Sequence, residues 1–471
     1  MRSALVLVAV AATVAAAAYA APAAKPDLTQ QPPLPAQAPW KAPVPSVTTT
    51  AAGPHIVVLP QHQLPMVHVL VTIPAGSALD PRNRPGLAAA VAGMLQDGGA
   101  GQRSAPEIAQ ALADLGTEIE EHVDPDQVQL SLTVLSRNLD RALALVDDLV
   151  RRPRFDAADW QRAQTRRIDE IHRRLDEPER LADDLFNRVL YGDHPYGHPF
   201  LGTIESVRAI TAGELRAFWA KHYAPANITF ILVGDVDAEA VGKRFAGDPP
   251  AKPAAWPAPP PPPVAHGARV VLVDRPGAPQ SQLRVGHLGA ARVTPDFAAL
   301  SVVETVLGGS FTSRLNLNLR EKHGYTYGAR ASYDFRSAVG PFVAAAGVRT
   351  DATAAAFEEM VAEIAGMRAP LSADELKKGR RLVMNSIVEA FGDGTEAAQY
   401  LADLVAHRLP LDAWSLLPAK LAALDVATVG NAAQRYLHPD DLTILVVGDR
   451  KVVEPSLRLL PFVKSLEIMT P

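Results

Sequence analysis

Arg320 and Tyr327 are the two residues whose types and spacing best suit chemistry, and they lie seven positions apart in the segment Leu319–Tyr327. A guanidinium and a phenol hydroxyl can both donate hydrogen bonds to a peptide carbonyl. Aimed at a carbonyl under attack, buried donors of this kind stabilise the developing oxyanion by roughly 3–4 kcal/mol each. The alternative is structural: Arg320 would form a helix salt bridge, and Tyr327 would pack in a core strand.

The residues before this segment predict how the pair is positioned. Gly308, Gly309 and Ser310 form a glycine-rich turn, followed by a stretch that leads to Arg320. Together with Tyr325, a second candidate donor, these three residues are predicted to line a substrate-binding groove.

The order Arg-Glu-x-x-Gly-x-x-Tyr, which begins at Arg320, resembles the Arg/Tyr segment of the pitrilysin/insulinase family of zinc peptidases. Those enzymes also carry an inverted zinc motif, His-x-x-Glu-His, early in the chain. The resemblance covers residues from about 52 to 460. In two-chain bacterial members of the family, one chain supplies the zinc and the general base, and the other supplies the Arg and Tyr.

The stretch Gly86–Met94 departs from that motif. A common family form is Gly-Leu-Ala-His-x-x-Glu-His-Met, but the two histidine positions hold Ala89 and Gly93, and the glutamate position holds Ala92. Alanine and glycine side chains have no lone pair to give a metal. The sequence therefore predicts that these positions bind no zinc and that the chain binds no cofactor of its own.

A third metal ligand in the family is a glutamate on a later helix. Counting the family's typical spacing from Gly93 reaches Glu170. One carboxylate alone does not hold zinc, so Glu170 is expected to be a remnant of the site or a helix-surface salt-bridge partner.

Four histidines are candidates for an alternative metal site. His194 and His198 stand four residues apart, but Pro195 and Gly197 between them predict a loop rather than a helix, so a structural role is expected. His62 falls in a predicted turn and His68 in a predicted strand. Neither has a partner at ligand spacing, so surface or packing roles are expected.

The composition indicates a globular chain with large cores. Of the 471 residues, 48% are hydrophobic and 21% charged, and the formal net charge is −5. That balance gives no reason to expect a nucleic-acid partner. The chain has no cysteine, which excludes disulfides and a lipid-attachment cysteine.

The N-terminus reads as an export signal. Met1–Arg2 is weakly basic, an alanine-rich apolar run extends from Ala4 to Ala18, and Ala18–Ala20 fits a small-x-small cleavage site. We expect residues 1–20 to be a signal peptide cut after Ala20, which predicts a periplasmic or secreted protein. An uncleaved anchor is the alternative. No later segment has the length and apolarity of a membrane span.

Prolines divide the rest of the chain. Residues 21–52 are rich in Pro and Ala and predict a leader without packed elements. Residues 251–267, with five successive prolines from Pro259 to Pro263, predict a semi-rigid linker. The domains expected on either side are residues 53–250 and 268–460, followed by a tail at 461–471.

The two flanks of the linker share a pattern that indicates internal duplication. Tyr223–Asp235 and Tyr436–Asp449 both read as a turn, a buried strand and Gly-Asp. Four residues superpose at one constant offset: Pro225, Thr229, Gly234 and Asp235 on Pro439, Thr443, Gly448 and Asp449.

Hydrophobic periodicity predicts similar elements in both halves. Strands are expected at 56–59, 67–73, 127–134, 270–273 and 282–287. The strand at 127–134 alternates, which predicts a half-buried strand with Val128, Leu130, Leu132 and Val134 toward the core and Gln127, Gln129, Ser131 and Thr133 facing away. Helices are expected at 86–96, 137–151, 156–175, 179–190, 211–221, 297–307, 351–367, 372–390, 394–406 and 425–436. Asp156 and Ser372 are candidate N-caps. The fold class expected is α+β, with two homologous repeats, each an antiparallel-dominated sheet covered by helices. The family resemblance implies a clamshell-like arrangement.

The resemblance implies a non-catalytic, substrate-binding subunit of a periplasmic heterodimeric zinc peptidase that cleaves unfolded peptides. Arg320 and Tyr327 would act on a peptide held by a homologous partner that carries the intact motif and the zinc. The alternative is an inactive peptide-binding or scaffold protein with no hydrolytic role.

Overall fold

The computed structural model describes residues 40–49, 55–245, 254–265, 267–461 and 463–470. Residues 40–471 belong to one compact unit. The predicted signal peptide lies outside the described residues, as does the leader up to residue 39. Within the described part of the chain, no helix combines the length and the apolarity needed to cross a bilayer.

The first half builds a six-stranded mixed sheet with the strand order β1-β2-β6-β3-β5-β4. Its neighbours are antiparallel except for β2 and β6, which are parallel. The strands are β1 (Ser46–Thr49), β2 (His55–Pro60), β3 (Met66–Ile73), β4 (Glu120–Val123), β5 (Val128–Leu135) and β6 (Thr229–Gly234).

The second half repeats this design with the order β12-β7-β11-β8-β10-β9. Here β7 runs parallel to both β11 and β12, and the other pairs are antiparallel. The strands are β7 (Arg269–Asp274), β8 (Gln280–Leu288), β9 (Thr326–Tyr333), β10 (Pro341–Arg349), β11 (Thr443–Gly448) and β12 (Glu467–Met469). The α+β fold class and the sheet in each half are confirmed.

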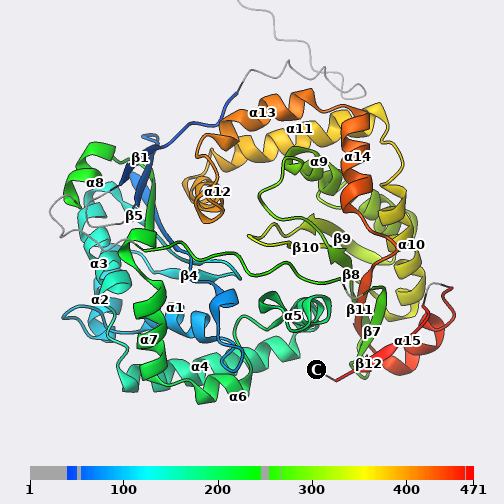
Figure 1. Cartoon of the computed structure of the whole chain (residues 1–471), viewed down its shortest axis with the longest axis horizontal. Helices are drawn as coiled ribbons and strands as arrows, with labels where there is room; N and C mark the ends of the chain where they lie inside the picture. The colour runs from blue at the N-terminus through cyan, green and yellow to red at the C-terminus, as the bar shows by residue number, and fades with distance from the viewer. Residues whose placement is uncertain (1–39, 50–54, 246–253, 266, 462, 471) are drawn as a thin grey trace, which may run out of the picture. The chain divides into compact units, whose positions relative to one another are not determined.

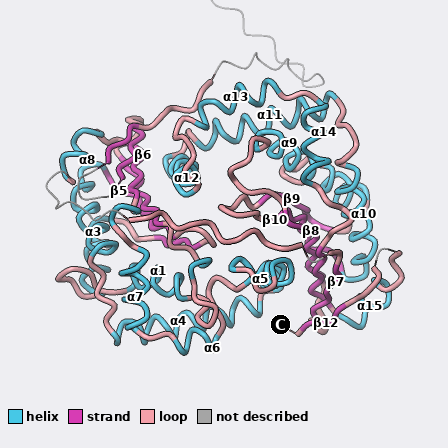
Figure 2. Tube along the Cα trace, viewed as in Figure 1, coloured by secondary structure: helices cyan, strands magenta, loops and turns pink. Residues whose placement is uncertain are grey.

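Helices pack against both sheets (Figure 2). The helices of the first half are α1 (Leu87–Asp97), α2 (Ala105–Leu115), α3 (Leu139–Arg151), α4 (Ala157–Asp176), α5 (Pro178–Tyr191), α6 (Ile204–Ala209), α7 (Ala212–His222) and α8 (Ala238–Arg244). Those of the second half are α9 (Phe297–Leu307), α10 (Thr353–Gly366), α11 (Ala373–Ala390), α12 (Gly394–Ala406), α13 (Ala413–Ala423), α14 (Val426–Tyr436) and α15 (Arg450–Leu457).

Each half gives one helix to the sheet of the other half. Helix α5 packs on β8 and β11 of the second sheet, and α12 packs on β3 and β6 of the first (Figure 1). The central strands β6 and β11 are buried along their whole length, so both faces of each sheet need an apolar cover. The exchanged helices provide the cover on one face of each sheet.

An ion pair accompanies the apolar contacts of α5. Arg284 of β8 is 1% exposed, and its Nε donates to Asp183 of α5 at 2.5 Å. Its Nη2 donates to the Glu179 carbonyl at 3.0 Å. A buried guanidinium needs such partners, because leaving it unpaired costs several kcal/mol. Arg284 therefore fixes how α5 sits on the second sheet.

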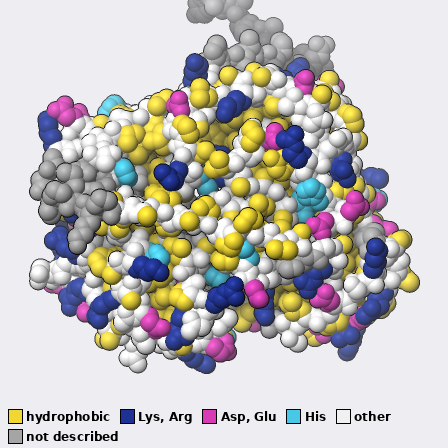
Figure 3. Space-filling view, viewed as in Figure 1, with side chains coloured by type: hydrophobic (Ala, Val, Ile, Leu, Met, Phe, Trp, Pro, Cys, Tyr) yellow, Lys and Arg dark blue, Asp and Glu magenta, His cyan; other side chains and the backbone are white. Residues whose placement is uncertain are grey.

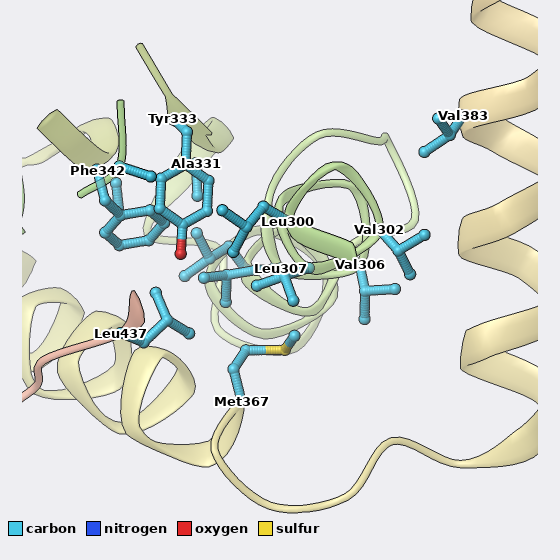
Figure 4. Close-up of a cluster of buried hydrophobic side chains, with 14 of the residues drawn as sticks. Leu300, Val302, Val306, Leu307, Ala331, Tyr333, Phe342, Met367, Val383 and Leu437 are labelled. Carbon is cyan, nitrogen blue, oxygen red and sulfur yellow. The ribbon is translucent and has the colours of Figure 1, made fainter. Parts of the chain in front are cut away.

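The core of the second half lies between its sheet and the helices α9 and α11 (Figure 4). Leu300 and Leu307 of α9 lie near Phe342 of β10, and Val302 and Val306 lie on the side of α9 that faces α11. Gly379 of α11 allows this approach, since a Cβ there would lie 2.9 Å from Val306. The two helices therefore pack with little space between them.

Most predicted elements occur close to their expected bounds, and α9 and α12 match theirs. Ser372 caps α11 as predicted, because its side chain accepts from the Glu375 N–H. Asp156 precedes α4 as predicted, but its side chain makes no capping hydrogen bond there. The periodicity analysis had not predicted the short elements α2, α13 and β4 or the β9–β10 hairpin.

Two expectations were wrong. The leader was expected to lack packed elements, but Ser46–Thr49 pairs with β2, and Trp40 packs against Phe391. The strand at 127–134 was expected to be half-buried, but Gln127, directly before β5, and Gln129 of β5 are only 7% and 5% exposed. Periodicity along one strand does not show what the rest of the chain lays over the other face.

Candidate functional site

Helix α1 carries the three positions where the family resemblance predicted a degenerate metal motif. Ala89 and Ala92 are 1% and 0% exposed, and Gly93 is buried with them. The helix starts at Gly86, whose φ is +89°, a value that favours glycine. Asp80 accepts hydrogen bonds from the Gly86 and Ala88 N–H groups, both at 2.7 Å, and burial raises the pKa of its carboxyl to about 7. The first turn is thus held firmly in place.

A guanidinium from α4 fills the space beside these small residues. Arg167 donates from Nη2 to the Ala89 carbonyl at 2.7 Å, and its side chain is 9% exposed. A Cβ added at Gly93 would lie 2.5 Å from the same nitrogen. The absence of side-chain bulk at position 93 is therefore what admits Arg167.

Glu121 of β4 provides the counter-charge. Its Oε1 lies 3.6 Å from the Arg167 Nη2, a salt bridge that is longer than a hydrogen bond. Burial raises the pKa of the Glu121 carboxyl to about 7, and the neighbouring Arg167 opposes that rise. A buried cation paired with a carboxylate thus occupies this corner.

Glu170 lies elsewhere on α4. Its Oε2 accepts from Arg173 at 2.6 Å and its side chain is 38% exposed, as expected for the salt-bridge alternative. Arg173 is also the first cause that lowers the pKa of the Glu170 carboxyl. Along α4, the buried residues are Trp160, Ala163 and Ile171, and the Arg167 side chain also turns inward.

The donor set around α1 does not fit a zinc ion. Ala89, Ala92 and Gly93 offer no ligand atom, and a positively charged guanidinium lies against them. Among the residues that the structure describes, no three His, Cys, Asp or Glu side chains are grouped so that they could hold a metal.

Arg320 lies on a short π-helix, η5 (Asn316–Lys322). Wide turns of this kind are rare and often occur at functional sites. The Arg320 guanidinium lies over the Phe311 ring at 4.3 Å, and its Nε is 3.5 Å from a Glu321 oxygen. A cation–π contact holds the plane of the guanidinium while leaving its N–H groups free to donate.

Tyr327, at the start of β9, is 89% exposed, so the alternative that it packs in a core strand is wrong. Nearby, Phe311 is 66% exposed. Tyr325, the second candidate donor, stacks on His323 with ring centroids 4.9 Å apart. The segment thus presents a guanidinium, a phenyl ring and a phenol on the surface.

The glycine turn packs against β9. A Cβ at Gly308 would lie 2.1 Å from the Ala331 nitrogen, and one at Gly309 would lie 3.0 Å from the Thr305 Cα. The Ser310 carbonyl accepts from the side chain of Asn316 at 3.0 Å. Close packing thus accounts for these residues, while their predicted role as substrate-binding residues stays a prediction.

The outer edge of β9 is covered by side chains. Asn316 accepts from the Ala329 N–H at 2.9 Å, and Glu304 of α9 accepts from the Tyr333 N–H at 3.0 Å. An edge strand with its N–H groups occupied is a poor template for an added strand. The Ala329 and Tyr333 N–H groups are therefore not available to an added strand.

The histidines have structural positions. His194 Nδ1 accepts from the Tyr196 N–H at 3.1 Å, which leaves Nε2 to donate to the Pro261 carbonyl of the linker at 2.7 Å. His62 pairs with Asp235 at 2.8 Å. His68 is buried, with Nδ1 2.9 Å from the Thr133 hydroxyl, and burial lowers its pKa to about 4.

Sequence reasoning missed Arg167 and Phe311. Arg167 stands in the run Arg166–Arg167, where nothing in the sequence tells which side chain turns inward. Phe311 directly follows the glycine turn, and an aromatic residue on such a turn was a signal that could have been noted.

Comparison with family models places two matches on this chain. Residues 56–204 match the model "Insulinase (Peptidase family M16)", and residues 209–383 match "Peptidase M16 inactive domain". An uncharacterized zinc protease of Mycobacterium leprae is 30% identical over 244 residues, which are 49% of this chain and 53% of that protein. The chain spans about half the length of the curated relatives it matches.

Solved structures share the fold over most of their length. A crystal structure titled as a peptidase M16 inactive domain, from Pseudomonas fluorescens, has a TM-score of 0.79 and 28% identity, covering 86% of this chain and 98% of its own. A protease from Helicobacter pylori has a TM-score of 0.78 and 20% identity, covering 86% and 99%. Because its sequence identity is only 20%, the Helicobacter pylori protein shows similarity of fold alone.

The contact between Gly93 and Arg167 predicts the effect of a single methyl group. Gly93→Ala should displace the guanidinium and break its bond to the Ala89 carbonyl, lowering the free energy of unfolding by about 1–3 kcal/mol. Chemical denaturation monitored by circular dichroism would measure it. Gly430→Ala in α14 is the matched control, since a Cβ there meets nothing within 4 Å and should be neutral or slightly stabilising. Equal stability of the two variants would contradict the assignment.

The buried carboxyl of Glu304 predicts a pH dependence of stability. Burial raises its pKa to about 7, against roughly 4.3 in an unfolded chain. Between those values the folded state keeps a proton that the unfolded state has lost, so its contribution to stability falls as the pH rises from about 4.5 to 7. Glu304→Gln stays neutral and keeps an acceptor for the Tyr333 N–H.

The variant should therefore lose less stability than the wild type between pH 5 and 8, by roughly 1–3 kcal/mol. Denaturation curves at four pH values would measure this, with the exposed Glu358→Gln as the control. Parallel pH profiles for Glu304→Gln and the wild type would show that Glu304 is not the titrating group.

Proposed function

Because this chain is a homologue of the M16 (insulinase) family of zinc peptidases, we propose that it is the substrate-binding subunit of a two-chain peptidase. A homologous partner with an intact inverted motif would carry the zinc. The substrates would be unfolded peptides, and the complex would lie in the periplasm after signal cleavage.

The contrast between the two candidate sites carries this proposal. On α1 the metal-motif positions are buried and packed against Arg167, so nothing there can bind a substrate or a metal. On η5 and β9, Arg320 and Tyr327 are accessible, and within the described chain the Tyr327 hydroxyl makes no hydrogen bond. Hydrogen-bond donors that are free at the surface can donate to an acceptor on a bound molecule.

The chemical role follows from the donors. The Arg320 guanidinium and the Tyr327 hydroxyl would donate to the carbonyl of the peptide bond that the partner holds. As charge develops on that oxygen, these hydrogen bonds strengthen, and each donor contributes roughly 3–4 kcal/mol when the closed complex excludes water. Phe311 supports the role because it holds the guanidinium by its face.

The second candidate function is a peptide-binding or scaffold protein without hydrolytic activity. The exposed Phe311 and Tyr327 favour it as well, because aromatic side chains at a surface are common in binding sites. The two candidates differ in whether a partner with an intact motif exists.

Peptidase activity, measured for this chain alone and in a mixture with a homologue, separates the two candidate functions. This chain should be inactive on quenched-fluorescent peptides with zinc and active when mixed with a family homologue that has an intact motif. Inactivity in the mixture, with peptide binding that Arg320→Ala weakens, would instead establish the binder.

Within an active complex, Arg320→Ala and Tyr327→Phe should each lower kcat about 100-fold or more and change KM little. Steady-state kinetics on one peptide would measure this. Tyr325→Phe tests the second candidate donor, and Arg458→Ala, directly after α15, is a surface-charge control. Unchanged kcat in both Arg320→Ala and Tyr327→Phe would refute the assigned role.

A further inference from the structure

A cavity of about 580 Å³ lies beneath the proline-rich linker. Trp256 and the prolines from Pro257 to Pro261 form one wall, and residues of both halves form the others. An extended green segment crosses the middle of Figure 1, and Figure 3 shows mostly hydrophobic side chains across that part of the surface. The cavity lies away from the residues of α1, η5 and β9 discussed above, none of which border it.

The linker is fastened on both sides of this cavity. His194 donates from Nε2 to the Pro261 carbonyl at 2.7 Å, and the side-chain amide of Asn227 donates to the Ala255 carbonyl at 3.0 Å. Prolines have few backbone conformations to lose on fixing. The linker thus forms a fixed and largely apolar wall of the cavity.

The opposite wall comes from the end of α12. The Leu409 N–H bonds the Leu404 carbonyl at 2.8 Å and the Arg408 N–H bonds the Val405 carbonyl at 3.0 Å, which together are a Schellman cap. Arg408 occupies the left-handed position of this cap, with φ +54°, where glycine is normally preferred. Nothing in the helix end requires an arginine at a position where it is strained.

The Arg408 side chain borders the cavity and is exposed. Among the described residues its guanidinium makes no ion pair. Beside it His407 also borders the cavity; its Nδ1 lies 2.9 Å from the Asp403 carbonyl oxygen, and its Nε2 is buried without a partner in the described chain. The His407 side chain is only 6% exposed and its Nε2 is buried, so of these two residues it is Arg408 whose donors a ligand in the cavity can reach.

The carboxylates near this wall are already satisfied. Asp403 accepts from the Arg292 guanidinium at 2.6 Å, as well as from His407. Asp126 borders the cavity, but its two oxygens accept from the Tyr196 hydroxyl at 2.6 Å and the Ser337 N–H at 2.7 Å. Through Asp126, the turn at Asp124–Asp126 therefore links the two halves. Arg408 remains the charge without a counter-ion.

We propose that this cavity binds a carboxylate carried on an apolar group, with Arg408 holding the carboxylate and the Trp256–Pro261 wall covering the apolar part. A planar guanidinium pairs with a carboxylate through two parallel hydrogen bonds, which explains an arginine at a position that suits glycine. The source of such a ligand is either the C-terminus of a peptide or a free organic acid. The proposal does not depend on the proposed peptidase role.

Isothermal titration calorimetry on the full chain tests the proposal with four probes. These are acetyl-Leu-Leu-Leu as the free acid, the same peptide as its C-terminal amide, N-acetylleucine and acetate. The free-acid peptide should bind at least tenfold more tightly than the amide. If N-acetylleucine binds as well as the free-acid peptide, the source is a small organic acid; if it binds at least tenfold more weakly, the source is a peptide C-terminus. Acetate lacks the apolar group and should bind at least tenfold more weakly than the better of the two acids.

Arg408→Gly is the decisive variant, because its two effects have opposite signs. It should raise the melting temperature by about 1–3 °C by relieving the strained cap, yet weaken binding of the free acid at least tenfold. Loss of binding therefore cannot come from unfolding. Arg408→Lys should keep part of the affinity for the free acid. Arg244→Gly, at the end of α8 and away from the cavity lining, should leave that affinity unchanged.

Three outcomes overturn the proposal: equal affinity for the acid and the amide, no binding of either peptide, or unchanged affinity in Arg408→Gly. None of them bears on Arg320 or Tyr327, so a failure here leaves the proposed function to its own kinetic test.

Discussion

The exchange of α5 and α12 between the two sheets is the contact on which the rest of the fold depends. Strands β6 and β11 are buried along their whole length, so each sheet would expose an apolar face without the helix from the other half. Burial of apolar surface contributes about 25 cal/mol per Å². Since neither half covers both faces of its own sheet, the two halves are parts of one cooperative unit, in line with the single compact unit from residue 40 onward.

This exchange also determines where the linker runs. The chain leaves the first half after α8 and must reach β7, and the proline-rich segment does so under the constraint of His194 and Asn227. Prolines have no N–H to donate to a strand ladder, so a run of five prolines does not join either sheet. The cavity beneath it exists because the segment stands off from the end of α12 instead of packing onto it.

The two candidate sites illustrate how substitution changes a position's role. Small residues at Ala89 and Gly93 made room for Arg167, so a helix face that could have held ligands became core packing with one internal ion pair. On η5 the arginine is not packed into the core, because the Arg320 guanidinium lies over the Phe311 ring at the surface. The buried Arg167 contributes to stability, and Arg320, which is 34% exposed, is available for binding.

The sequence by itself determined the class of fold, the duplication and most helices, because periodicity and the repeated Tyr…Gly-Asp segments are local signals. It also determined that positions 89, 92 and 93 hold no ligand, since side-chain identity alone decides that. Only the tertiary structure decided that Arg167 rather than Arg166 fills the space beside Gly93, that Tyr327 is exposed, and that Arg408 faces a cavity. These facts depend on which distant segments meet, and no spacing along one chain segment encodes the packing of a helix against a sheet from the other half.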